Sequence, residues 1–130
     1  MRLFILLTIM IFCSSSLKAS TQDILNRICP EITTYASSYL ACITSGASPD
    51  LVQACGNMTR YSDSFEYCLK SPASPIQATA CGLSTSKQST FKQCLKIVSE
   101  KNLYGVSIIF CKQSTNNSES FLNCLNSTEQ

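Results

Sequence analysis

The most reactive side chains in this sequence are cysteines. Nine are present without a single histidine, and six of the seven gaps between the eight that follow residue 20 are thirteen residues long. Structural zinc sites favour ligands two to four residues apart, and redox motifs use C-x-x-C. No two cysteines are that close, so we expect disulfides and no metal or other cofactor. The eight are Cys29, Cys42, Cys55, Cys68, Cys81, Cys94, Cys111 and Cys124.

Groups for acid–base or nucleophilic catalysis are sparse. Without histidine, neither a Ser-His nor a Cys-His pair can form. Of the eight carboxylates, Asp63 and Glu66 share an expected helix face at i, i+3, which could mimic a catalytic pair. No other part of the chain repeats this arrangement, and a solvated helix face explains it more simply. We therefore expect the protein not to be an enzyme.

The cysteines belong to an internal repeat. The phrase "ACGNMTRYSDSFEYCLK" returns twenty-six residues later as "ACGLSTSKQSTFKQCLK", and four units follow the form C-x3-T-x4-[ST]-[FY]-x2-C-[LI]. Such a fixed period identifies a repeat protein whose units must stack on one another to bury apolar surface. We expect the repeated Thr and Ser residues to cap helices or turns. The aromatic position holds Tyr39, Phe65, Phe91 and Phe121.

Helical spacing dominates each unit. Phe65, Cys68 and Leu69 lie at i, i+3 and i+4 on one helix face. In the first two units apolar residues extend this face toward the N-terminus, and in the second unit these residues are Met58 and Tyr61. The last two units are polar at these places, which predicts a later helix start. The fold class expected is all-α: a small disulfide-rich helical repeat protein of four units of about 26 residues, with short and longer helices alternating.

The short helices carry their own boundary signals. Ser48-Pro49 and Ser74-Pro75 are typical helix beginnings, with serine as N-cap and proline in the first turn. Gly56 and Gly82, each directly after a cysteine, suit a helix end. Only residues 104–110, "YGVSIIF", favour a strand by composition.

The pairing of the cysteines is open, because eight allow 105 combinations. The constant thirteen-residue spacing inside units favours bridges within each unit. A continuous helix between the two cysteines would separate them by roughly 19 Å, whereas a disulfide needs Cα atoms within about 7 Å. Bridges within units therefore require a bend, which Gly56 and Gly82 could supply.

Residues 1–20 resemble a secretory signal peptide, and residues 21–130 are expected to form a single disulfide-stabilised helical repeat domain. Arg2 precedes a ten-residue apolar run, which is too short for a membrane span. Removing this segment takes away Arg2 and Lys18 and leaves eight basic and eight acidic residues, which favours neither nucleic-acid nor membrane binding. Lipidation at Cys13 is a weaker alternative, because the small residue that normally precedes such a site is here Phe12.

An even number of cysteines in a short exported chain indicates an oxidising compartment, extracellular or, in a bacterium, periplasmic. Asn57, Asn116 and Asn126 begin N-glycosylation sequons, which matter only in a eukaryotic secretory pathway.

Three functions fit these features. The first is a secreted, non-enzymatic binding protein that displays disulfide-locked helices to a protein partner. The second is a carrier of a small apolar ligand lined by the four repeated rings, and the third is an inhibitor or toxin-like effector. The third linker, residues 95–110 between Cys94 and Cys111, has sixteen residues instead of twelve, and this departure from the repeat suggests where a partner would bind, unless its apolar side chains cap the core. The candidate interaction patch comprises Tyr104, Val106, Ile108 and Ile109.

We expect all eight cysteines of the mature chain to be oxidised, which makes its intact mass eight hydrogens lower than that of the reduced chain. Mass spectrometry before and after reduction measures this difference. Alkylation of two or more thiols without reductant would contradict the disulfide framework.

Overall fold

All regular secondary structure in the described part of the chain is helical. The computed structural model describes residues 21–129, which contain eight helices and no strand, whereas the expected signal peptide, residues 1–20, lies outside the described residues. The all-α prediction is confirmed. The strand that composition favoured at residues 104–110 is not formed, because a helix begins in this segment. The helices are residues 21–32, α2 (Ala36–Thr44), α3 (Pro49–Met58), α4 (Ser62–Lys70), α5 (Pro75–Ser84), α6 (Gln88–Glu100), α7 (Gly105–Ser114) and α8 (Ser118–Ser127).

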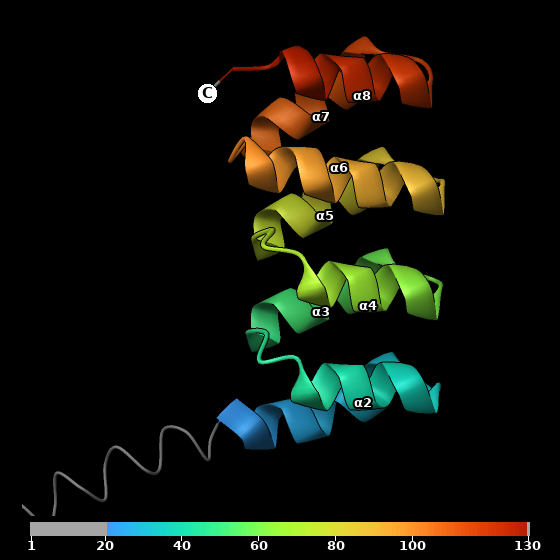
Figure 1. Cartoon of the computed structure of the whole chain (residues 1–130), viewed down its shortest axis with the longest axis vertical. Coiled ribbons are helices and arrows are strands. Elements are labelled where there is room, and N and C mark those ends of the chain that lie inside the picture. Colours follow the sequence, from blue (N-terminus) through green and yellow to red (C-terminus); the bar gives the residue numbers. More distant parts are fainter. Residues whose placement is uncertain (1–20, 130) are drawn as a thin grey trace, which may run out of the picture.

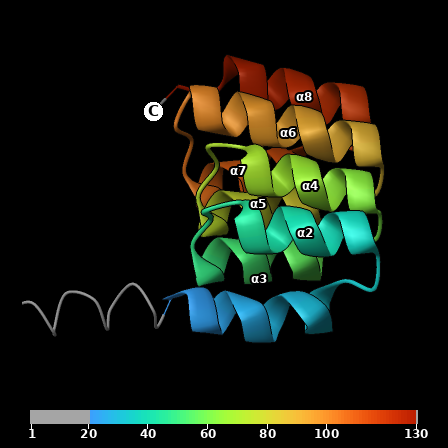
Figure 2. The same ribbon diagram turned by 60° about the horizontal axis from the view of Figure 1, so that its bottom comes forward.

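Each repeat is a helical hairpin, and the hairpins stack along one axis (Figure 1). Three-residue turns join the helices within a hairpin, and four-residue loops join successive hairpins. The second helices, α2, α4, α6 and α8, pack on one another in one layer, and α3, α5 and α7 pack in the other (Figure 2). This arrangement is the stacked repeat that the period predicted, because each hairpin buries its apolar face against its neighbours.

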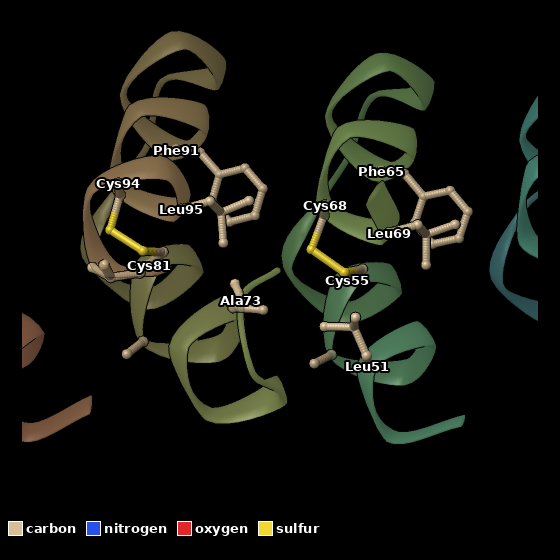
Figure 3. Packing of buried hydrophobic residues seen from close by; sticks show 14 of the residues in the cluster. Leu51, Cys55, Phe65, Cys68, Leu69, Ala73, Cys81, Phe91, Cys94 and Leu95 are labelled. Carbon is tan, nitrogen blue, oxygen red and sulfur yellow. A yellow bond between two sulfur atoms is a disulfide. The ribbon is translucent and has the colours of Figure 1, made fainter. Parts of the chain in front are cut away.

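One disulfide closes each hairpin. Cys29 pairs with Cys42, Cys55 with Cys68, Cys81 with Cys94, and Cys111 with Cys124, with Cα atoms 5.6 to 5.9 Å apart. Figure 3 shows two of these bridges, each connecting the two helices of its own hairpin. Pairing within units is therefore confirmed, and the three-residue turn supplies the bend that this pairing requires.

Threonine, and not glycine, marks the turn. The hydroxyls of Thr59, Thr85 and Thr115 each donate to the carbonyl oxygen of the cysteine four residues earlier, at 2.6 to 2.8 Å. These bonds give an additional partner to a carbonyl group in the last turn of each helix, and the Thr59 amide donates to the same Cys55 oxygen at 3.1 Å. The prediction that Gly56 and Gly82 end the short helices was wrong, since both lie inside α3 and α5.

The two glycines instead allow neighbouring hairpins to approach closely. A Cβ atom at Gly56 would lie 2.5 Å from Ile32 Cγ2, and one at Gly82 would lie 2.5 Å from Met58 Cγ. In both cases the side chain three residues after the first cysteine of one unit packs on the glycine of the next unit. The glycines are therefore packing positions between repeats.

The predicted helix starts are confirmed for α3 and α5. Ser48 accepts a hydrogen bond from the Leu51 amide, and Ser74 forms a reciprocal capping box with Gln77. The second helices all begin seven residues after the first cysteine of their unit. The predicted backward extension in the early units and late start in the last two were therefore wrong.

The longer third linker is an extra turn of helix α6. In the first two hairpins, Ser45 and Ser71 follow the second helix, and each hydroxyl donates to the carbonyl oxygen of the preceding cysteine. Ile97 occupies this position in the third hairpin, and α6 continues to Glu100. Since four residues make about one helical turn, the insertion lengthens α6 and leaves the next loop at four residues.

A buried side chain anchors this extended end. Gln77, 6% exposed, donates from Nε2 to the carbonyl oxygens of Val98 and Leu103, at 3.0 and 2.9 Å. The loop between α6 and α7 is thereby fixed on α5, which determines where α7 begins.

The repeated rings form much of the core. In Figure 3, Phe65 with Leu69 and Phe91 with Leu95 point from the second helix toward the preceding hairpin. Phe65, Phe91 and Phe121 are buried. Tyr39 is partly exposed, because the described chain has no hairpin before the first one.

We expect Gly82→Ala to lower the free energy of unfolding by up to about 2 kcal/mol. Overpacking costs about 1–3 kcal/mol, which is offset in part by the ~1 kcal/mol gained when alanine replaces a helical glycine. Denaturant unfolding of the oxidised protein measures the change. Leu40→Ala, at an exposed position of α2, serves as control with little effect. An increase in stability for Gly82→Ala would show that the hairpins are not packed this closely.

Candidate functional site

The candidate interaction patch at the start of α7 is exposed only in part. Tyr104, Val106 and Phe110 project into solvent, and Ile109 is half-buried. Ile108 is completely buried in the core, so its inclusion in the candidate patch was wrong. A helix places residues 106 and 110 on one side and residue 108 on another, which explains the division.

Two residues of α5 extend this exposed surface. Ile76 and Leu83 lie seven positions apart, which places them on the same side of the helix two turns from each other. Together with the exposed residues of α7 they form what we call the apolar stripe: Ile76, Leu83, Tyr104, Val106 and Phe110, which are 65–77% exposed.

The apolar stripe lines an open groove of about 1080 Å³. Ala54, Ala80 and Ile109 also line this groove. The groove contains none of the four repeated rings that were expected to line a ligand cavity.

Equivalent positions of α3 are polar. Ile76 and Leu83 lie five residues before and two residues after Cys81, and the corresponding residues around Cys55 are Asp50 and Asn57. The hairpin therefore folds with polar side chains at these positions, and its architecture does not require the apolar ones. Ile76 and Leu83 were not predicted as site residues, although comparison of the aligned units at these two positions would have found them.

A glycine brings the beginning of α7 close to α5. The first helical residue is proline in α3 and α5 but Gly105 in α7. A Cβ atom at Gly105 would lie 2.8 Å from Ile76 Cγ2. The absence of a side chain at this position allows Ile76 and the start of α7 to form one continuous surface.

Asp63 and Glu66 are engaged by different neighbouring helices. Asp63 on α4 forms an ion pair with Lys92 on α6 and accepts a hydrogen bond from Gln88 Nε2 at 3.1 Å. Glu66 accepts from the Ser38 hydroxyl on α2 at 3.3 Å. The two carboxylates therefore connect the second hairpin to the hairpins on either side of it.

The three sequon asparagines are all exposed. Asn57 and Asn126 lie near the ends of α3 and α8, and Asn116 lies in the turn between α7 and α8. Asn57 also borders the groove. Glycosylation of these residues remains a prediction.

Other features of residues 21–129 offer less for ligand binding. A hollow of about 470 Å³ between the second and third hairpins has polar side chains such as Arg60 and Lys87 beside Phe91. Within the described range, no group of three His, Cys, Asp or Glu side chains could hold a metal ion. Over the same range, no helix has the length and apolarity needed to cross a bilayer.

Comparisons with known proteins found no match: no protein-family model, no curated protein and no solved structure is significantly similar to this chain.

Proposed function

We propose that this protein is a secreted, non-enzymatic binding protein that presents the apolar stripe to another protein. The observation that carries the proposal is the contrast between Asp50 and Asn57 on α3 and the apolar Ile76 and Leu83 at the same positions of α5. Large exposed apolar patches in soluble proteins tend to mark interaction sites. Because the repeat folds without apolar residues there, binding is a better explanation than stability.

The disulfides would help by holding the stripe in place. A surface that is already ordered before binding loses less conformational entropy when the partner arrives. Both helices that carry the stripe belong to hairpins closed by a disulfide, Cys81–Cys94 and Cys111–Cys124. The stripe is thus a preorganised binding surface.

Four disulfides within the chain fit an oxidising environment. Secretion, with removal of residues 1–20 as a signal peptide, is part of the proposal. In a eukaryotic pathway, glycans at Asn57, Asn116 or Asn126 would make the protein a glycoprotein.

Transport of a small apolar ligand is the alternative. Small-molecule sites typically bury 70–90% of the ligand surface, whereas the groove along α5 and α7 is open to solvent. Native mass spectrometry of freshly secreted protein separates the two functions, because a carrier would retain an apolar small molecule.

We expect the double variant Tyr104→Ala, Val106→Ser to lose capture of a protein partner from the fluid into which the protein is secreted. Removing central apolar anchors typically weakens binding by about 30-fold or more. Both residues are exposed, so the helicity and melting temperature of a single copy of the chain should not change. Quantitative pull-down, circular dichroism and thermal melting measure these effects.

Tyr61→Ala is the matched control. Tyr61 is exposed to a similar extent as Tyr104 and also precedes a helix as its N-cap, but it lies at the turn before α4, outside the groove. Equal loss of capture by this control and the double variant would contradict the proposal. A marked fall in melting temperature for the double variant would instead indicate that the two residues stabilise the fold.

A further inference from the structure

The apolar stripe is large enough for an interface between two copies of the chain. Its five side chains are 65–77% exposed, which amounts to on the order of 700 Å² per copy at about 200 Å² for a large side chain. The largest apolar patch on a typical monomer is about 300–600 Å². Two such surfaces together would bury roughly 1,400 Å², within the range of about 1,200–2,000 Å² found for stable protein interfaces.

Charge does not oppose contact between two copies. Helix α5 contains no charged residue, and the single charged residue of α7, Lys112, is not part of the stripe or the groove lining. Two stripes can therefore face each other without burying an ionised group, which would be costly. Asp50, on α3, lies at the edge of the groove.

We infer that the partner of the apolar stripe is a second copy of this chain, with α5 of each copy packed against α7 of the other. The inference rests on the proposed function, because it takes the stripe to be a protein-binding surface. Closed two-fold symmetry is the commonest arrangement of such pairs.

The order of the helices favours this particular two-fold axis. Helices α3, α5 and α7 lie side by side in one layer, and only α5 and α7 carry the stripe. A two-fold axis that runs parallel to the helices, between α5 and α7, places α5 of each copy on α7 of the other. It leaves α3 outside the interface. An axis across the helices would place α3 on α3 and bring two copies of Asp50 into the contact.

The side chains are also complementary under this symmetry. Phe110 lies one residue before Cys111, whereas Ile76 and Leu83 lie five residues before and two residues after Cys81. When Cys111 of one copy and Cys81 of the other lie at the same height along the parallel helices, Phe110 of the first copy meets the space between Ile76 and Leu83 of the second. Ala80 forms the floor of this space, and its small side chain leaves room for the ring. Large side chains of one helix packing between those of another are the usual form of helix contact.

Sedimentation equilibrium of the oxidised, secreted chain between about 1 and 200 μM tests the inference. We expect a dimer, and we expect Ile76→Asp and Phe110→Lys each to raise the dissociation constant at least about 30-fold, as loss of an interface anchor does. Circular dichroism verifies that both variants retain their helicity. Leu40→Asp, at a similarly exposed leucine on α2, is the matched control and should remain dimeric.

Mixing the two variants tests the pairing of α5 with α7. The carboxylate introduced by Ile76→Asp in one chain would then face the ammonium group introduced by Phe110→Lys in the other. The mixture should therefore form a heterodimer although each variant alone is monomeric. A mixture that stays monomeric would overturn this arrangement.

The inference fails if the unaltered chain is monomeric at about 200 μM, or if its dimer persists in both stripe variants. If the chain is monomeric but the Tyr104→Ala, Val106→Ser variant still loses capture of a different protein, only the second-copy inference falls. The proposed function then stands with another partner.

Discussion

The rest of the structure depends on the disulfide that closes each helical hairpin. Isolated helices as short as these, at most thirteen residues, are only marginally stable in water. A single hairpin also has too little apolar surface to form a core of its own. The cross-link joins its two helices at a constant separation, and each bridge stabilises a small protein by about 2–4 kcal/mol, mainly by restricting the unfolded chain. Seven of the eight paired cysteines are buried, so the bridges are also part of the core.

Because a bridge closes each hairpin and the repeated rings pack between hairpins, the outer faces of α3, α5 and α7 can vary. The buried side of each of these helices carries a cysteine and, three residues before it, an apolar residue: Val52, Ala78 or Ile108. The outer side carries Asp50 and Asn57 in one unit and Ile76 and Leu83 in the next. Repeat proteins commonly use such variable positions for binding on a constant framework. We propose that the apolar stripe is a functional surface on a scaffold in which one disulfide closes every unit.

Sequence patterns predicted the framework better than the boundaries or the surface. The thirteen-residue spacing and the i, i+3, i+4 pattern of Phe65, Cys68 and Leu69 correctly predicted stacked helical units with internal bridges. Glycine, however, supports both a helix end and a close contact, and only the positions of Ile32 and Met58 in space show that Gly56 and Gly82 serve the second role.

The third linker also shows what the sequence pattern alone could not predict. Its four additional residues are visible in the sequence, but their addition to α6 depends on Ile97 replacing a capping serine and on the hydrogen bonds of Gln77. The exposure of Phe110 and the burial of Ile108 follow from which side of α7 faces the core. The apolar stripe could not be assembled without the contact between α5 and α7, which joins residues from two separate units.

The most direct test of this account is the disulfide map of the secreted protein. Digestion with trypsin and an aspartate-specific protease at slightly acidic pH, which slows thiol–disulfide exchange, separates the cysteines of the last three hairpins, and Asp50 provides the cleavage between Cys42 and Cys55. Mass spectrometry without reduction should find the fragment of Cys55 joined to that of Cys68, Cys81 to Cys94, and Cys111 to Cys124. A fragment in which Cys68 is joined to Cys81 would contradict the account, because the bridges would then connect hairpins instead of closing them.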